Sequence, residues 1–178
     1  MTGDQVTTGD QATSGDRATT AGDPWPALIA ASEHIRAAAA ERDPWLAELR
    51  VAGIGWGTVE LDRATHELAG LGPFTAAVRD VSLGATAARS PLAERWRPAL
   101  VVLEPDTEGL LAASLARFGE GVLVLWLGPL DRADVDDTPR LGPSRNGPLG
   151  PARLVVGRPA WGPHVLVLAG VAPRSRDD

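Results

Sequence analysis

The clearest pattern of apolar and polar positions lies in the middle of the chain, where its period changes twice. Residues 100–103 form a short apolar run, and a proline two residues later interrupts it. Asp106 or Thr107 then opens a helical pattern that continues to Phe118, where a Gly-Glu-Gly break follows. Residues 122–127 are apolar without interruption, which is typical of a strand in the centre of a sheet. The segment therefore predicts a strand, a helix and a buried strand in that order.

Two helix starts precede this segment. Asp23 followed by Pro24 combines an N-cap carboxylate with a proline in the first turn, and apolar residues then recur at helical spacing as far as Arg42. The pair Asp43 and Pro44 repeats the signal and predicts a short helix over 45–49. We expect both helices to pack on a sheet or on a partner chain.

The stretch from Val51 to Leu61 alternates glycine with larger residues. Successive residues of a strand point to opposite faces. One face would therefore carry three glycines and the other three larger side chains, namely Gly53, Gly55 and Gly57 against Ile54, Trp56 and Thr58.

Weaker signals mark the remaining elements. Asp62 is a plausible N-cap for a helix that runs through Leu68. Residues 128–150 are rich in proline, glycine, aspartate and arginine, and they predict a long loop with at most one short helical turn. Further strands are expected over 74–83, 85–89, 152–156 and 164–171, the last two being joined by a hairpin connection at 157–163.

Composition narrows the chemistry. The 178-residue chain has neither cysteine nor lysine, which excludes disulfides, thiolate catalysis and Schiff bases on lysine. A net charge of −6 and scattered arginines argue against nucleic acid as a partner. No apolar segment approaches the length of a membrane span. The polar, acidic N-terminus does not resemble a secretory signal, so we expect a cytoplasmic location.

The chain divides into four parts. Residues 1–23 form a degenerate array of Thr, Ser, Gly and Asp, which predicts a disordered tail. A calcium-binding glycine–aspartate repeat is the alternative, but it would need apolar positions that stack. Residues 24–50 are a helical segment, 51–172 are one domain that contains the loop 128–150, and 173–178 are a polar tail.

Three phrases of the sequence resemble one known superfamily. They are AGIGWGTVELDRATHEL, RDVSLGATA and LVVLEPDTEGLLAASLARFGEG, which together fall within residues 52–127. They are similar to the opening strand and helix, the second strand, and the module junction of vicinal oxygen chelate proteins, the glyoxalases and methylmalonyl-CoA epimerases. The resemblance implies an α+β fold in which paired βαβββ modules form a cupped mixed sheet, here with an extra N-terminal helix. It also implies a homodimer.

The same resemblance implies a divalent metal, held in the cup by His, Gln or Glu side chains. The matching positions in this chain are Gly53, Val101 and Val124, and the last strand carries no carboxylate. Because none of these side chains can donate an electron pair to a metal, we predict no metal and no cofactor. Val124 and Trp126 share the inward parity, so the glycine face is either a floor for a flat ligand or a space that Trp126 fills.

A few polar and aromatic residues remain as candidates for a site. His164 begins a core strand beside Trp161 and could lie at the mouth of the cup. Glu60 and Glu104 could act as general bases, although strand parity points Glu104 away from the cup. The predicted ligand-binding set is Gly53, Gly55, Trp56, Glu60, Glu104, Trp126, Trp161 and His164.

Three functions stay open at this point. The first is a metal-independent glyoxalase-like protein that binds a small organic molecule in the cup or has lost its activity. The second is a lyase or isomerase of the same fold that uses a glutamate or histidine base. The third is a dimeric interaction module built on the helix over 24–42.

Overall fold

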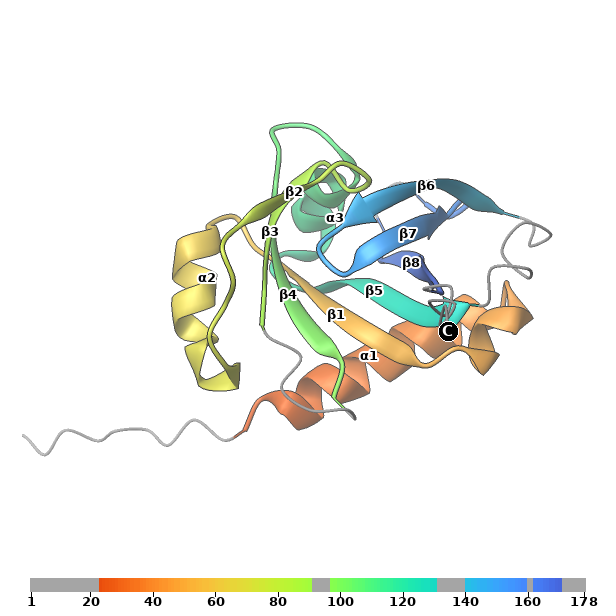
Figure 1. The fold of residues 1–178 in the computed structure, drawn as a ribbon, viewed down its shortest axis with the longest axis horizontal. Helices are drawn as coiled ribbons and strands as arrows, with labels where there is room; N and C mark the ends of the chain where they lie inside the picture. The colour runs from red at the N-terminus through yellow and green to blue at the C-terminus, as the bar shows by residue number, and fades with distance from the viewer. Residues whose placement is uncertain (1–22, 91–96, 131–139, 160–161, 171–178) are drawn as a thin grey trace, which may run out of the picture.

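The computed structural model describes residues 23–90, 97–130, 140–159 and 162–170. In these ranges eight strands form one curved mixed sheet accompanied by three α-helices (Figure 1). Residues 1–22 of the tail predicted over 1–23, the tail predicted over 173–178 and the candidate Trp161 lie outside the described residues. The helices are α1 (Trp25–Ala40), α2 (Leu61–Glu67) and α3 (Leu110–Phe118), with 3₁₀ turns η1 (Pro44–Glu48) and η2 (Ala69–Leu71).

The sheet is built from two similar halves. The strands are β1 (Val51–Gly57), β2 (Val78–Asp80), β3 (Ala85–Arg89), β4 (Ala99–Pro105), β5 (Gly121–Leu130), β6 (Leu141–Gly147), β7 (Gly150–Val155) and β8 (His164–Ala169). Their order is β2-β3-β4-β1-β5-β8-β7-β6. In each half the first strand pairs in parallel with the fourth, and the halves join where β1 pairs antiparallel with β5. This arrangement confirms the predicted α+β fold of paired modules.

The inner face of the sheet is closed by apolar packing. Side chains from β3, β4, β5, β7 and β8 meet there, and α3 covers the end of the cup at which β1 finishes. The outer strands β2 and β6 approach one another, so the sheet nearly closes on itself (Figure 1). Asp80 lies at this approach, and a Cβ on Gly147 would stand 2.9 Å from its Oδ2 atom.

The outer face is covered by two helices that come from different parts of the chain. The side chains of α2 pack over Ala88 and Val102 in the first half. In the second half Trp25 and Leu28 of α1 pack in one cluster with strand residues such as Val165. The prediction that the N-terminal helices pack on the sheet is therefore confirmed, and α1 gives the second half the cover that α2 gives the first.

An ion-pair cluster fastens the end of α1 to the second half. Asp43, which follows α1, is 5% exposed and accepts from Arg140 Nη1 at 3.2 Å. Arg158 Nη2 lies 3.5 Å from the other oxygen of Asp43 and donates to the carbonyl of Ala39 at 3.0 Å. The carboxylate that the sequence marks as a helix cap thus binds two arginines distant in sequence.

The prediction of a long loop over 128–150 is wrong at both ends, and the short helical turn expected within it lies outside the described residues. Strand β5 continues to Leu130, and Leu141–Gly147 is strand β6. Residues 143–146 of β6 are exposed, and the strand lies at the edge of the sheet, where a proline need not donate a ladder hydrogen bond. Because β6 buries little, it has no apolar alternation by which to recognise it.

Two predicted boundaries also need correction. The strand expected over 74–83 is only Val78–Asp80. The helix α2 begins at Leu61, one residue before the expected cap at Asp62, and the Glu104 carboxylate of β4 accepts from the Leu61 backbone N–H at 2.8 Å. A capping group from another strand takes the place of the local one, so the local sequence does not reveal where the helix starts.

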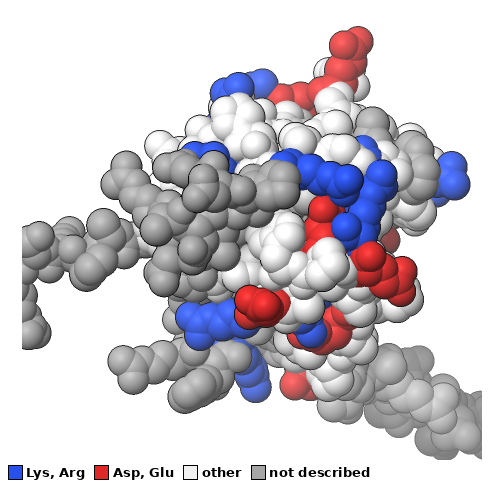
Figure 2. Space-filling view, turned by 90° about the vertical axis from the view of Figure 1, so that its right-hand side faces the viewer, with Lys and Arg blue, Asp and Glu red and all other residues white. Residues whose placement is uncertain are grey.

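Charged side chains of both signs are mixed on the surface. Figure 2 shows arginines beside aspartates and glutamates on one face of the molecule. None of the helices in the described ranges is long and apolar enough to cross a membrane.

The inner packing leaves no room for a side chain in the middle of β1, which yields a stability prediction. A Cβ on Gly55 would lie 2.6 Å from Val124 Cβ and 2.9 Å from Leu103 Cδ1. We expect Gly55→Ala to lower the free energy of unfolding by about 1–3 kcal/mol, measured by urea denaturation. The control is Gly70→Ala, where no atom lies within 4 Å of the new methyl group. Equal stability of the two variants would contradict the close packing of β1.

Candidate functional site

The indole of Trp126 occupies the centre of the cup. This residue of β5 is fully buried, and its ring lies against the glycine face of β1. A Cβ on Gly55 would stand 2.9 Å from Trp126 Cζ3, and one on Gly53 would stand 3.2 Å from Trp126 Cε3. The sequence left two interpretations open, a floor for a flat ligand or a space filled by Trp126. In the structure Trp126 fills the space.

The positions that match the metal ligands of the superfamily converge in this packed interior. Val101 and Val124 are both fully buried among apolar neighbours. At Gly53 the place of a side chain is taken by Leu149, whose Cδ1 would lie 2.3 Å from an added Cβ. Within the described ranges no group of three or more His, Cys, Asp or Glu side chains could hold a metal ion. The residues present do not fit a divalent metal in the cup.

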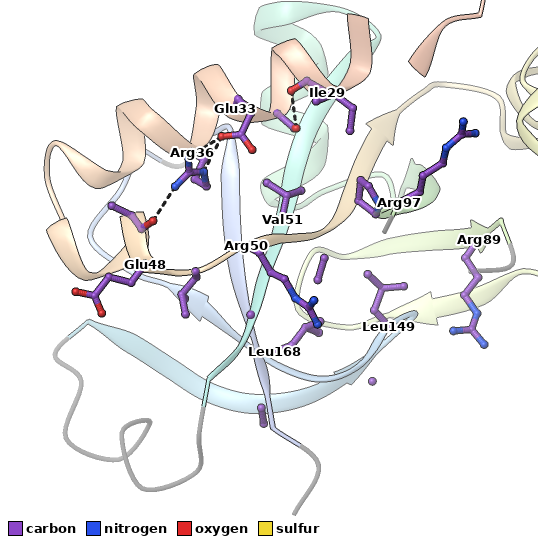
Figure 3. A pocket seen from close by; sticks show the side chains of 18 of the residues that line it. Ile29, Glu33, Arg36, Glu48, Arg50, Val51, Arg89, Arg97, Leu149 and Leu168 are labelled. Atoms are coloured by element: carbon purple, nitrogen blue, oxygen red, sulfur yellow. Dashed lines mark hydrogen bonds and ion pairs between the residues drawn. The ribbon is translucent and has the colours of Figure 1, made fainter. Parts of the chain in front are cut away.

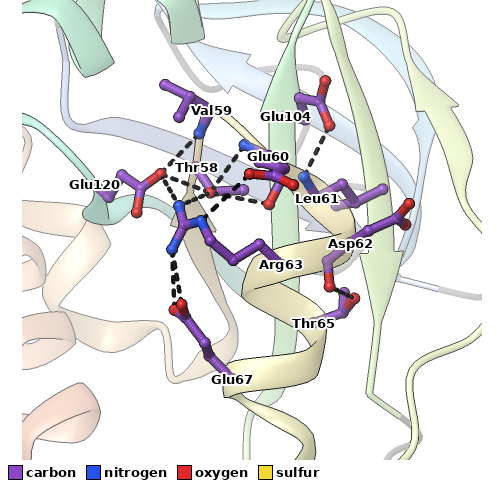
Figure 4. A network of polar contacts seen from close by, with 10 residues as sticks. All are labelled: Thr58, Val59, Glu60, Leu61, Asp62, Arg63, Thr65, Glu67, Glu104 and Glu120. Carbon is purple, nitrogen blue, oxygen red and sulfur yellow. Dashed lines mark hydrogen bonds and ion pairs between the residues drawn. The ribbon is translucent and has the colours of Figure 1, made fainter.

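Three other predicted site residues lie on the outer face. Glu104 caps α2, and the side chain of Glu60 is 65% exposed with an oxygen 3.6 Å from Arg63 Nε (Figure 4). Trp56 packs with the apolar side chains that lie between the outer face of the sheet and the helices α1 and α2. The structure therefore brings Gly53, Gly55 and Trp126 together and places these three elsewhere.

A polar network that the sequence did not indicate surrounds Arg63 on α2. Arg63 Nη2 donates to Glu120 Oε1 at 2.5 Å, and the Thr58 hydroxyl and the Val59 N–H donate to the same oxygen at 2.8 and 3.0 Å. The hydrogen bond from Arg63, followed by those from Val59 and Thr58, lowers the pKa of Glu120 to about 2. The network connects α2 to Glu120, the residue before β5, and its role is structural (Figure 4).

His164 lies at the end of the cup that α3 covers. It is 3% exposed, and its Nε2 atom is 2.9 Å from Ser114 Oγ and 3.2 Å from the Leu110 carbonyl. Burial lowers the pKa of His164, against a smaller opposing effect of the hydrogen bond to Leu110. The imidazole is thus a buried neutral group that fastens β8 to α3, and it is closed off from solvent.

Asp80 is a second buried ionisable group that the sequence did not single out. Its Oδ1 atom accepts from the backbone N–H groups of Ser82 at 2.8 Å and Leu83 at 3.2 Å. Burial raises the pKa of Asp80, and Oδ2 has no hydrogen-bond partner in the described part of the chain. These contacts close the turn after β2.

A groove lies at the opposite end of the cup from α3 (Figure 3). It has a volume of about 1250 Å³ and lies between α1 with η1 and the strand ends where β1 starts and β5 and β8 finish. Its apolar walls include Ile29, Leu49, Val51, Pro98, Leu149, Pro151 and Leu168, and its charged residues are Glu33, Arg36, Glu48, Arg50, Arg89 and Arg97.

Some arginines of the groove have interaction partners and others have no ion pair. Arg36 is held by Glu33 at 2.7 Å and by the Ala47 carbonyl at 2.9 Å, and the Arg97 guanidinium lies 5.8 Å from the centre of the Trp25 ring. Among the described residues, Arg50 and Arg89 have no ion-pair partner. In Figure 3 the Arg50 side chain projects into the groove beside Leu149 and Leu168.

Sequence reasoning missed this groove because its arginines are far apart in the chain. They come from α1, from the residue before β1, from the end of β3 and from the residue before Pro98. No local motif joins them, and only the order of strands brings them to one end of the cup. A signal did exist in the predicted sheet, since these positions adjoin strand ends that meet at one edge.

The buried imidazole gives a pH prediction. The folded pKa of His164 is depressed below the usual 6.5, so its stabilising effect is complete above pH 6.5 and is lost as the pH falls toward the folded pKa. We expect the free energy of unfolding to drop by at most about 1.4 kcal/mol per pH unit there, measured by denaturation at several pH values. His164→Gln should flatten this slope, whereas His34→Gln, at an exposed position, should keep it. An unchanged slope in His164→Gln would contradict the assignment.

Comparison with known proteins gives a fold and no close relative. No protein-family model matches the sequence, and no curated protein sequence does. A Streptomyces coelicolor methylmalonyl-CoA epimerase variant in complex with 2-nitronate-propionyl-CoA matches with a TM-score of 0.57 and 20% identity over 69% of this chain and 98% of its own. The Mycobacterium tuberculosis methylmalonyl-CoA epimerase matches with a TM-score of 0.56 and 15% identity over 68% of this chain and 88% of its own.

A hypothetical protein from Bacillus halodurans also matches, with a TM-score of 0.53 and 15% identity over 70% of this chain and 96% of its own. At these identities the likeness speaks for the architecture of the chain and leaves its chemistry open. Together with the strand order and the paired halves, it shows that the chain has the fold of the vicinal oxygen chelate superfamily.

Proposed function

We propose that this chain binds a small amphipathic organic anion in the groove at the end of the cup, without metal-assisted chemistry. The observation that carries the proposal is the pairing of a filled cup with an open, arginine-lined groove beside it. In the sequence-based hypothesis the ligand lay inside the cup. The groove is now the better location, because Trp126 and Leu149 take up the space in the cup.

The charge of the groove favours an anion. Four arginines and two glutamates line it, which leaves a local net charge of +2 in a chain whose net charge is −6. The guanidinium group presents planar pairs of N–H donors that match a carboxylate or phosphate. Arg50 is the first choice for this contact, since it projects into the groove (Figure 3).

The walls of the groove favour an apolar body on the same ligand. Val51, Leu149 and Leu168 line the region that Arg50 reaches. Small-molecule sites commonly combine such apolar walls with a few polar groups that fix orientation. The solved epimerases bind methylmalonyl-CoA or a nitronate analogue of propionyl-CoA, and these ligands are themselves anionic molecules with apolar parts.

A metal-free isomerase is the second candidate, and the epimerase neighbours favour it. The bases expected from the sequence do not support it, because Glu60 and Glu104 lie outside the cup and His164 is buried at its far end. Of the two groove glutamates, Glu33 pairs with Arg36, whereas Glu48 forms no ion pair within the described part of the chain. It would be the base in this alternative.

The binding proposal predicts the effect of removing Arg50. Octanoate should bind to the wild-type protein with measurable heat in isothermal titration calorimetry. Arg50→Gln should weaken that binding about tenfold or more, because a hydrogen-bonded charge is lost. The matched control is Arg145→Gln, an exposed arginine on β6 that does not line the groove, and its affinity should equal that of the wild type. Absence of saturable binding, or an equal loss in both variants, would reject the groove as the site.

The choice between binding and isomerisation can be tested with methylmalonyl-CoA in D₂O. We expect no exchange of the C2 proton above the protein-free rate, with or without Mn²⁺, because Glu60 and Glu104 lie outside the cup and His164 is closed off from solvent. Proton NMR of the substrate measures this exchange directly. Exchange that disappears in Glu48→Gln would establish the isomerase alternative in place of simple binding.

A further inference from the structure

Leu149 belongs at once to the groove and to the interior of the cup. It lies in the Gly-Pro-Leu-Gly turn between β6 and β7, and its side chain is partly buried. It lines the groove, yet its Cδ1 atom would stand 2.3 Å from a Cβ on Gly53. A methyl group of Leu149 therefore occupies the space that a side chain at position 53 would need.

The place that the Leu149 methyl group fills is bounded by surfaces that would accept another apolar group. One side is the backbone of Gly53, and another is the Trp126 ring, whose Cε3 atom would lie 3.2 Å from a Cβ on Gly53. The indole Nε1 of Trp126 is buried and has no hydrogen-bond partner in the part of the chain that the structure describes. Leu149 and Trp126 belong to one apolar cluster, so a ligand that reached this point would meet apolar surface.

We propose that Leu149 is the residue that sets how far the apolar end of a ligand penetrates from the groove into the cup. This inference rests on the proposed binding function. The charged end of the ligand lies at Arg50, and its chain runs past Leu168 until it meets Leu149 (Figure 3). Shortening Leu149 joins the groove to the space over Gly53 and Trp126, and a longer chain then fits.

The experiment measures affinity against chain length. Straight-chain carboxylates from butanoate to decanoate are titrated calorimetrically into the wild-type protein and into Leu149→Ala. In the wild type the affinity should rise with each methylene and then level off. In Leu149→Ala it should continue to rise for one or two further methylenes, by about fourfold for each. Leu149→Val should extend the rise in the same direction by less, and it serves where the alanine variant is too unstable.

The matched control is Leu168→Ala, which removes the same atoms from another leucine of the groove. No atom of Leu168 is among those that a Cβ on Gly53 would meet. Leu168→Ala should therefore weaken the binding of carboxylates of every chain length without changing the length at which affinity levels off. A merely structural role for Leu149 would likewise lower affinity evenly.

The two proposals fail in different ways. If the wild type binds carboxylates through Arg50 but the levelling point stays fixed in Leu149→Ala and Leu149→Val, the role of Leu149 is overturned and the binding function stands. If no carboxylate binds to any of the proteins, both proposals are overturned.

Discussion

The contact between the Trp126 indole and the glycine face of β1 is the constraint on which the rest of the structure depends. Strands β1 and β5 join the two halves of the sheet, and their inner faces meet here. Gly53 and Gly55 have no side chains, so a fully buried tryptophan lies flush against the backbone. A buried tryptophan contributes more apolar area than any other side chain, which makes the join between the halves a large part of the core.

This contact also decides what the interior can do. A cup whose floor holds an indole has no volume for the metal and the chelated oxygens that the superfamily fold can accommodate. The valines at the matching positions extend the same apolar packing, and His164 is used to fasten β8 to α3. The fold is thus formed by residues whose side chains fill the cup, and the groove at its end is the concave surface that we propose for a ligand.

The sequence predicted those features whose signal lies within one continuous segment of the chain. The alternation of glycine with larger residues in β1 is a local pattern with a period of two, and it predicted the strand and its two faces. The resemblance to the superfamily then assigned the glycine face to the cup. The sequence did not predict edge strand β6, because the side chains of that strand are exposed. It did not predict the capping of α2 by Glu104, because the capping group comes from another strand. The groove escaped for the same reason, since its arginines meet only after the sheet has formed.

The position of α1 connects the stability of the fold with the groove. This helix covers the outer face of the second half, and Asp43 with Arg158 fixes its end against that half. The same helix and the turn η1 also supply one wall of the groove, including Ile29 and Leu49. A helix recruited to shield the sheet therefore also creates the concave surface beside it. The groove shares Leu149 and Leu168 with the interior of the cup, while the ion pair between Asp43 and Arg158 holds its outer wall. One end of the sheet is therefore concave, while apolar side chains fill its centre.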